Sequence, residues 1–506
     1  MIRNNFSQQS NKRYLVAWLY LTCLLALSGC GSKDKSSTGY IQLYNLSANS
    51  PQIYLTVDDY SDESFNTKTY SAISFTQVSS RFTYDAATYD IELAWQSEYN
   101  NQYELENVYE APLEIKGDHL EFIVISEDIK SPSVHTYNIP IRSDDEVSND
   151  NDDEVFNVKS LNMHTWSEGI DIYYSESDET FNEAKLLNNV NYSEISENQK
   201  LAQNEYIFYI TSSGADEVLY ISQDIAFPYA SDYIFVVRNN TGVGSSPFIL
   251  DIVSTSSVNE YPDMNSEASY RIYNGVIEHE LLAGYENSFD FHINSIDDSP
   301  EVLALEFGQF SPTTLTSSGD YSMSLVSSAN QSQIITNHLL PLNENTNKTI
   351  FFYLLEEAVD EDGDGDIDED GDGYIDEKTI TVNSLIVNNS TKESIYSHQM
   401  TVINLIDQDE IVDDFTNVKI FFVKSDETIE TAAQSLTTVF AKPSSIELIN
   451  NTYTVYVIGK LDSSDIILTS TELVLNEDSK NKYIILEKNT GGETGYKMTF
   501  SNQNSE

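Results

Sequence analysis

The chain has 506 residues, which is too long for a single hydrophobic core, so we expect several domains. Acidic residues outnumber basic residues by 82 to 26, and the resulting net charge of −56 excludes nucleic acid and anionic head groups as general partners. Tyrosine (33) and phenylalanine (22) are abundant, whereas glycine (20) and proline (11) are sparse, which favours strands over helices.

The first segment has the order of features found in a secretory signal. Three bases precede an apolar stretch at 14–27 that is too short to span a bilayer comfortably, and "LSGC" follows at 27–30. This order resembles the lipobox of bacterial lipoproteins. The resemblance implies a signal peptide at 1–29, lipidation of Cys30 and a flexible tether at 30–38. The alternative is an ordinary secretory signal with an incidental cysteine.

Acyl chains at Cys30 are therefore the expected link to a membrane, because no second apolar stretch of spanning length follows in the sequence. Residue 31 is Gly, whereas Asp at this position retains lipoproteins at the inner membrane of enteric bacteria. We thus expect a cell-envelope location, at the outer membrane rather than the inner one. Cys23 lies in the signal, so the mature chain has one cysteine and no internal disulfide.

Four segments share a tyrosine followed by apolar residues at the second and fourth positions, the alternation of a half-buried strand. They begin at Tyr89, Tyr206, Tyr321 and Tyr453. About thirty residues after each tyrosine comes a fully apolar strand, at 120–125, 233–237, 349–355 and 483–486. Upstream of each lies an opening strand, which starts at Tyr40, Val155, Tyr270 and Asn417. The spacing from opening strand to tyrosine is shorter in the fourth copy.

Short strands at this density predict an all-β protein with four tandem Ig-like β-sandwich modules after the signal peptide. The predicted modules cover 39–141, 154–256, 268–406 and 415–501, joined by acidic or serine-rich stretches at 142–154, 253–267 and 407–414. The alternative is one large β-barrel or solenoid. The stretch "QLYNLSANSPQIYLTVDD" at 42–59, followed by the tyrosine strand, resembles the family called domain of unknown function 4397. That resemblance implies tandem modules in a bacterial lipoprotein or surface protein, without known catalytic residues.

Catalytic motifs of hydrolases, metalloproteases and nucleotide-binding enzymes are missing from the sequence. The seven histidines are scattered and form no pair at metal-ligand spacing. Trp95 and Trp166 could stack on a sugar, although tryptophan in a sandwich usually belongs to the core.

An octapeptide repeats in tandem in the third module, as "DEDGDGDI" at 360–367 and "DEDGDGYI" at 368–375. Alternate aspartates followed by glycine are typical of the first half of an EF-hand loop, where carboxylates converge on one ion. The bidentate Glu of position 12 is missing, so the stretch resembles the Asp-rich calcium repeats of extracellular proteins, such as thrombospondin type 3. The predicted Ca²⁺ ligands are Asp360, Asp362, Asp364, Asp366, Asp368, Asp370, Asp372, Tyr374 and Asp376.

The acidic insertion at 356–378 interrupts a hairpin of a folded module, and we expect it to bind one or two Ca²⁺ ions weakly. The alternative is a solvated acidic loop. The predicted function is a non-enzymatic, lipid-anchored envelope protein for binding, adhesion or scaffolding, with an envelope protein or a glycan as partner. The alternative is a carbohydrate-active enzyme or an accessory sugar-binding subunit with its site at a module junction.

Overall fold

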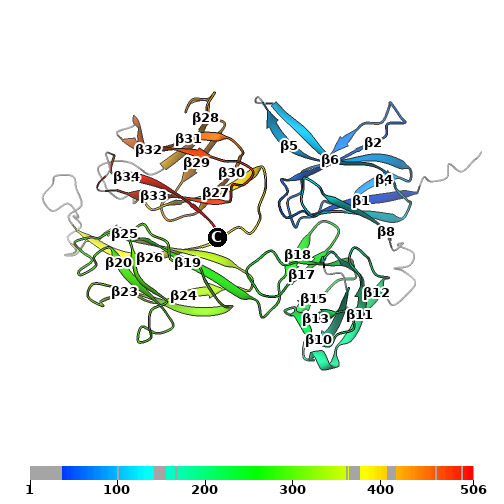
Figure 1. The fold of residues 1–506 in the computed structure, drawn as a ribbon, viewed down its shortest axis with the longest axis horizontal. Helices are drawn as coiled ribbons and strands as arrows, with labels where there is room; N and C mark the ends of the chain where they lie inside the picture. Colours follow the sequence, from blue (N-terminus) through cyan, green and yellow to red (C-terminus); the bar gives the residue numbers. More distant parts are fainter. Residues whose placement is uncertain are drawn as a thin grey trace, which may run out of the picture.

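The computed structural model describes residues 37–99, 102–141, 155–165, 169–360, 363, 377–406, 418–461, 464–489, 491 and 494–504. Within these residues the strands form eight sheets, two in each of four β-sandwiches (Figure 1). The predicted fold class is confirmed. The described part of the chain contains no helix that is long and apolar enough to cross a membrane.

Each module is a set of consecutive strands. Module 1 contains β1 (Thr38–Leu46), β2 (Ile53–Asp58), β3 (Lys68–Thr69), β4 (Phe82–Asp85), β5 (Thr88–Tyr99), β6 (Gln102–Glu114), β7 (His119–Ser126) and β8 (Ser133–Pro140). Module 2 contains β9 (Val155–Asn162), β10 (Ile170–Glu176), the 3-10 turn η2 (Phe181–Glu183), β11 (Lys185–Val190), β12 (Gln199–Ala202), β13 (Glu205–Ser212), β14 (Val218–Ile221), β15 (Ile225–Ala226), β16 (Asp232–Asn239), β17 (Phe248–Val253) and β18 (Val258–Tyr261).

The second half of the chain repeats the pattern. Module 3 contains β19 (Glu267–Gly275), β20 (Ser288–Ile293), β21 (Val302–Glu306), β22 (Thr314–Ser317), β23 (Gly319–Ser327), β24 (Gln333–Leu342), β25 (Asn347–Ala358) and β26 (Lys378–Asn388). Module 4 contains β27 (Ser397–Asn404), β28 (Val418–Lys424), β29 (Gln434–Thr438), β30 (Ser444–Ile449), β31 (Thr452–Leu461), β32 (Ser464–Val474), β33 (Lys482–Lys488) and β34 (Tyr496–Asn502).

All four modules share one topology. One sheet has its opening strand in the middle, in the orders β4-β1-β7-β8, β12-β9-β16-β17-β18, β22-β19-β25-β26 and β30-β27-β33-β34. The opening strand pairs in parallel with the apolar strand near the end of the module, as β1 does with β7. The other sheet holds the tyrosine strand, in the orders β3-β2-β5-β6, β11-β10-β13-β14, β21-β20-β23-β24 and β29-β28-β31-β32.

Two predicted module boundaries are wrong. Strand β27 lies in the range assigned to module 3, but it pairs in parallel with β33 of module 4. The opening strand of module 4 is therefore Ser397–Asn404, and the predicted one at Asn417 corresponds to the second strand, β28. Strand β18 lies in the stretch predicted as a linker, yet it pairs with β17 of module 2. Acidic or serine-rich composition marked loops as well as module joints.

A buried asparagine near the end of each opening strand explains the repeat. Its Oδ1 accepts a hydrogen bond from the backbone N–H two residues later, at 2.9–3.0 Å, which fixes the turn after the strand. These residues are Asn45, Asn162, Asn274 and Asn404, all fully buried. Measured from this asparagine, the tyrosine of module 4 is no longer closer than in the other copies.

The four repeated tyrosines each fix a corner of the sandwich. Each hydroxyl donates to the carbonyl oxygen four residues upstream, the arrangement of the tyrosine corner in Greek-key sandwiches. The bonds join Tyr89 to Asp85 (3.2 Å), Tyr206 to Ala202 (2.9 Å), Tyr321 to Ser317 (2.8 Å) and Tyr453 to Ile449 (3.0 Å). The pattern in the sequence is thus a folding determinant and not a ligand site.

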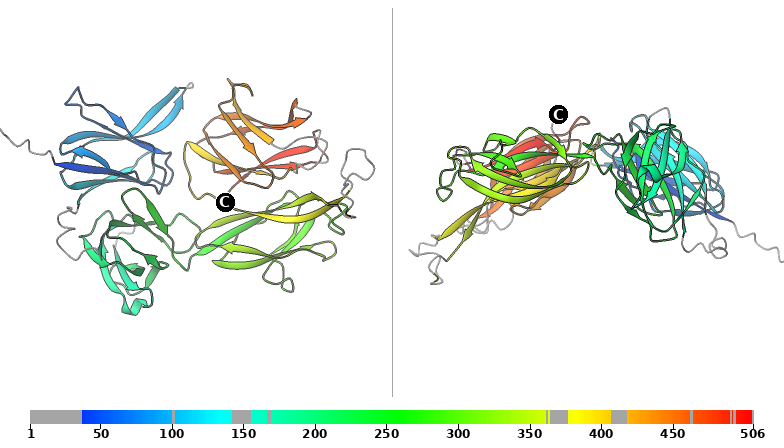
Figure 2. Two further views of the ribbon diagram at one scale, coloured as in Figure 1. Left: turned by 180° about the vertical axis from the view of Figure 1, so that it is seen from behind. Right: turned by 90° about the horizontal axis from the view of Figure 1, so that it is seen from below.

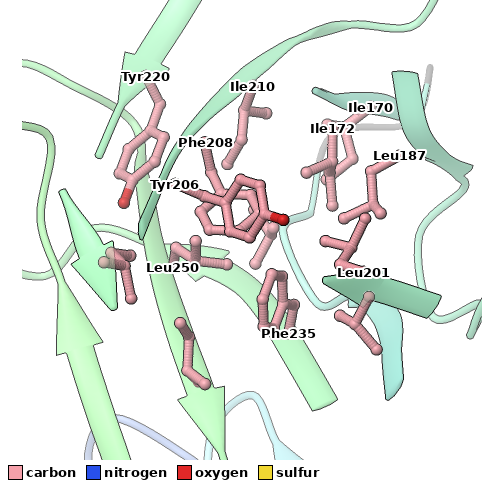
Figure 3. Packing of buried hydrophobic residues seen from close by; sticks show 14 of the residues in the cluster. Ile170, Ile172, Leu187, Leu201, Tyr206, Phe208, Ile210, Tyr220, Phe235 and Leu250 are labelled. Atoms are coloured by element: carbon pink, nitrogen blue, oxygen red, sulfur yellow. The ribbon is translucent and has the colours of Figure 1, made fainter. Parts of the chain in front are cut away.

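Each sandwich has its own hydrophobic core, shown for module 2 in Figure 3, where Phe208 and Phe235 meet from opposite sheets. The apolar strands β7, β16, β25 and β33 are buried on both faces, because one face lines this core and the other lines a second module. One inter-module cluster contains Phe122 of module 1 and Val236 of module 2. A second contains Phe351 of module 3 and Tyr483 of module 4.

These two clusters define two seams, seam 1–2 and seam 3–4. A fully buried aliphatic or aromatic side chain contributes roughly 1.5–3 kcal/mol, and each seam buries several of them. Apolar interfaces of this kind hold neighbouring domains together as one body. The chain therefore forms two rigid pairs of modules, which lie side by side (Figure 1).

The two pairs touch at both ends. Modules 2 and 3 meet through Asn240 and Asn345, which exchange side-chain hydrogen bonds of 3.2 and 2.9 Å. A Cβ on Gly242 would come within 2.3 Å of Asn345, so this loop needs glycine to approach module 3. Modules 1 and 4 meet through Glu98 and Lys424, whose charged atoms lie 2.8 Å apart. The four modules thus close into a ring.

Candidate functional sites at the module junctions

The acidic stretch lies at the tip of a long hairpin. Strands β25 and β26 pair up to Ala358 and Lys378, and the hairpin projects from the body of module 3 (Figure 2). The backbone N–H of Val359 donates to the carbonyl oxygen of Glu377 at 3.1 Å, which carries the ladder one step further. The strand pairing therefore includes the first and last residues of the predicted insertion at 356–378, and most of its middle lies outside the described residues.

Only one of the predicted calcium ligands lies in the described residues. The Oδ1 of Asp360 accepts a hydrogen bond of 2.6 Å from the backbone N–H of Gly363, the fourth residue of the first octapeptide. The ligands at 362, 364, 366, 368, 370, 372, 374 and 376 lie outside the described residues. Cys30 and Trp166 also lie outside them. The structure describes no group of three or more metal-ligating side chains in the part of the chain that it covers.

A buried ionic network lies in seam 1–2. The carboxylate of Asp251 is fully buried and accepts from Nε of Arg238 at 2.6 Å and from the hydroxyl of Tyr44 in module 1. Arg238 also pairs with Glu260 and lies over the ring of Phe75, 5.7 Å from its centroid. Burial raises the pKa of Asp251, against the opposing effect of Arg238. The network ties the two modules together.

In seam 3–4 a buried cation, Arg271, has no carboxylate among its partners in the described residues, and the buried carboxylate of the seam, Glu487, pairs with Lys497 instead. Arg271 is 4% exposed, and its Nε donates to Thr349 at 3.2 Å. The guanidinium lies 4.2 Å from the ring centroid of Phe310 and 5.8 Å from that of Tyr483, and it donates to the carbonyl oxygen of Asn502. Burial lowers the pKa of Arg271 to about 10. Ring faces and neutral acceptors stabilise this charge.

A central cavity of about 650 Å³ lies where the four modules meet. Its lining comes from every module: Ala48, Asn49, Thr241, Gly242, Val243, Ser269, Thr313, Leu315, Asn347, Thr391, Glu393 and Asn504. Asn347 and Asn504 hydrogen-bond to each other at 2.9 Å across the junction. The Oγ of Ser269 is buried and has no partner among the described residues. The amides of Asn347 and Asn504 therefore join modules 3 and 4 at the cavity wall.

A second junction cavity, of about 440 Å³, lies between modules 1 and 4. Trp95 packs on the core of module 1, and its ring lies 4.7 Å from that of Tyr396. The hydroxyl of Tyr396 accepts from the backbone N–H of Glu98 at 2.5 Å. Trp95 therefore packs on a core at a module junction, as expected for tryptophan in a sandwich, and stacking on a sugar stays a prediction.

Sequence reasoning missed the residues of both seams. Arg238 and Asp251 are separated by thirteen residues, but they face each other because β16 and β17 pair at Val236 and Asp251. A charged residue inside an otherwise apolar strand is a signal that could have revealed them. Such a residue in a strand buried on both faces requires a partner in a neighbouring element.

No family model matches the chain, and no curated protein matches it. The resemblance to the domain of unknown function 4397 therefore stays a prediction. Among solved structures, the chain is similar to the Bacillus anthracis TIE protein, with 8% identity, coverage of 89% of this chain and 68% of that chain, and a TM-score of 0.14. It is similar to a DUF3823 family protein from Bacteroides ovatus, with 14% identity, coverage of 42% and 100%, and a TM-score of 0.12. It is also similar to the pilus adhesin SpaC from Lactobacillus rhamnosus GG, with 10% identity, coverage of 89% and 54%, and a TM-score of 0.14. At these TM-scores the similarities carry no argument about function.

Proposed function

We propose that this chain is a non-enzymatic binding or scaffolding protein of the bacterial cell envelope, held to a membrane by a lipid on Cys30. The observation that supports the proposal most is the closed ring. Four sandwiches bury two apolar seams, and the polar groups at their junctions are paired with one another. Such a body presents fixed loops and edges to a partner, and binding to it costs little conformational entropy.

The hairpin tip at 360–376 is the proposed calcium site. The turn at Asp360 and Gly363 lies at the start of the first octapeptide, and the carboxylate oxygens of the repeat favour a hard cation. Ca²⁺ would neutralise the carboxylates and stiffen the tip. Since the position-12 glutamate is missing, the expected affinity is weak, on the order of 10⁻⁴ to 10⁻³ M.

Two experiments test the envelope role. Metabolic labelling with a fatty-acid analogue should mark the wild-type chain and not the Cys30→Ala variant. Labelled lipid on the variant would contradict the anchor. Pull-down with the intact lipoprotein, followed by hydrolase screens on the purified mature chain, should give an envelope partner and no turnover. Turnover that a single carboxylate substitution abolishes would overturn the non-enzymatic proposal.

Sugar binding at the junction between modules 1 and 4 is the second candidate function. The cavity there combines the rings of Trp95 and Tyr396 with polar side chains, among them Asn107, while the amide of Asn450 is already bonded to His398 and Ile395. An aromatic face beside amides suits a saccharide, because the ring covers the C–H face while the amides bond to hydroxyls. A glycan array that shows binding lost in Asn107→Ala and retained in the distant Asn383→Ala would support this candidate.

A further inference from the structure

A third pocket opens at one end of seam 1–2, with a volume of about 430 Å³. Its floor is aliphatic, because Leu120, Ile139 and Ile234 belong to the inter-module cluster and are less than one-tenth exposed. Both modules contribute to the floor, so the pocket exists only while the seam is closed. This pocket, the seam pocket, lies outside the central cavity and the hairpin.

Three basic side chains line the seam pocket: Arg81 from module 1, and Lys159 and Lys200 from module 2. The chain has only 26 bases against 82 acids, so three of them at one small pocket is a marked concentration. Among the described residues, Arg81 and Lys159 have no carboxylate within ion-pair distance, although Asp232 and Glu197 also line the pocket. Asp232 instead accepts a hydrogen bond of 2.7 Å from the side chain of Asn157.

The guanidinium of Arg81 lies beside a buried amide. Its Nε donates to Oε1 of Gln42 at 3.5 Å, the only hydrogen bond that the described residues give it. Gln42 is fully buried, and its amide nitrogen donates to the carbonyl oxygens of Ser79, Ser254 and Thr255 at 3.0–3.1 Å. Burial lowers the pKa of Arg81. The chain therefore partly desolvates this cation, and the end of its planar fork has no hydrogen-bond partner among the described residues. Asp232 favours its charge from across the pocket without forming an ion pair, so the fork can still bind a carboxylate.

The walls carry amides. Asn198 donates to Oδ1 of Asn157 at 3.0 Å, and Asn157 donates to Asp232, so the amides form a short ordered row. The ring of Tyr233 lines the pocket but packs against Phe156 and Phe227 of the module 2 core, at 5.7 and 5.3 Å between centroids. It therefore offers no free face for a sugar to stack on.

We propose that the seam pocket binds the free C-terminus of a peptide with an aliphatic last residue. Arg81 and Lys159 would take the carboxylate, the aliphatic floor would take the last side chain, and the amide of Asn198, which Asn157 holds in place, would take a peptide group. Recognition of a chain end by a carboxylate clamp is an established mode of peptide binding. The proposal rests on the proposed binding role and names a ligand class for it.

The net charge argues against an acidic polysaccharide as the ligand. A polyuronate would bring many negative charges towards a surface of net charge −56, whereas a peptide end brings one carboxylate and can carry basic residues further upstream. The aliphatic floor also suits a Leu or Val side chain better than a sugar ring.

The test is an array of tetrapeptides that presents each of the twenty amino acids at a free C-terminus, with matched C-terminal amides, probed with the mature chain. Binding should be confined to free carboxylates with aliphatic last residues. Arg81→Gln should lower the affinity about tenfold or more, and Lys159→Gln severalfold. Arg81→Lys, which keeps the charge but loses the fork, should fall between wild type and Arg81→Gln.

Lys185→Gln is the control, because this exposed base lies on β11, in the sheet of module 2 that does not line the pocket, and should bind like wild type. Equal binding of acids and amides, no binding of any peptide, or affinity unchanged in Arg81→Gln would overturn the proposal. Binding of trigalacturonate instead of peptides would overturn the peptide assignment. If the pocket binds no peptide but a partner binds elsewhere on the ring, the proposed binding function still holds. Catalytic turnover would overturn the non-enzymatic function without bearing on the peptide pocket.

Discussion

The two halves of the chain have the same arrangement of paired sandwiches but differ in the side chains that surround the arginine buried in each seam. Each half pairs two sandwiches through strands that are apolar on both faces, and each buries one arginine in the seam. In seam 1–2, Arg238 meets the buried carboxylate of Asp251. In seam 3–4, Arg271 meets aromatic rings and neutral oxygens. The two arginines lie on different strands of the shared topology, Arg238 on the late apolar strand β16 and Arg271 on the opening strand β19, so the fold fixes neither the position of the buried cation nor its partners.

Replacing each arginine in turn should lower the free energy of unfolding by different amounts in the two seams. Arg238→Met leaves the charge of Asp251 buried and unpaired, so the free energy of unfolding at pH 7 should fall by about 3–5 kcal/mol. Arg271→Met leaves no buried carboxylate without its partner and removes a buried cation. The free energy of unfolding should therefore fall by less than about 1.5 kcal/mol. Urea denaturation of the mature chain measures both. Equal losses would show that the seams do not differ as described.

Acid should affect the first half through His164. This residue is 3% exposed, packs 4.5 Å from the ring of Phe248, and burial lowers its pKa from 6.5 to about 4. Below pH 6.5 the unfolded chain binds a proton that the folded chain refuses, so stability present at pH 7 is lost as the pH falls towards 4. The loss at pH 5 should be about 2 kcal/mol.

The difference between wild type and His164→Leu isolates this effect, because every other titrating group, including His398, is common to both proteins. Thermal melting across pH 7 to 4.5 is the measurement. Parallel pH profiles would refute the assignment to His164.

Calcium should act on the second half only, because the acidic hairpin extends from β25 and β26. At several millimolar Ca²⁺ and a dissociation constant near 10⁻³ M, binding should stabilise the chain by about 1 kcal/mol. Asp368→Ala, at the residue shared by the two octapeptide frames, should abolish most of the effect, and Asp465→Ala in module 4 should not. If calorimetry detects no heat of Ca²⁺ binding, the alternative interpretation of the stretch as a solvated acidic loop is correct.

Local patterns predicted the sandwiches because the order of apolar and polar residues in each strand shows which of its faces are buried. The repeated tyrosines, the alternating strands and the doubly apolar strands all follow from contacts within one module or one sheet face. The doubly apolar strands even contain the information that a second body covers them. The identity of that body is not encoded locally, since the contact between Tyr44 and Asp251 spans 207 residues.

Two predicted module boundaries were wrong because they also depend on contacts between distant segments of the chain. Strand β27 was assigned to module 3 because the acidic stretch at 407–414 suggested a joint after it, although β27 and β28 belong to the same module. Only the parallel pairing with β33 assigns it. The sequence also could not predict that Arg81 and Lys159 line a pocket, because nothing in the neighbouring residues of an isolated base indicates which distant residues it will lie beside.

The central claim is that four modules close into one ring, and the contact between the first and last modules tests it most directly. Nζ of Lys130 lies 2.7 Å from Oε2 of Glu477, and both side chains are more than half exposed, so replacing them should cost little stability. Spin labels on Lys130→Cys and Glu477→Cys, in a chain with Cys30→Ser, report their separation by pulsed electron spin resonance. The account predicts a short and narrow distance distribution. A broad distribution that extends to long distances would contradict the ring.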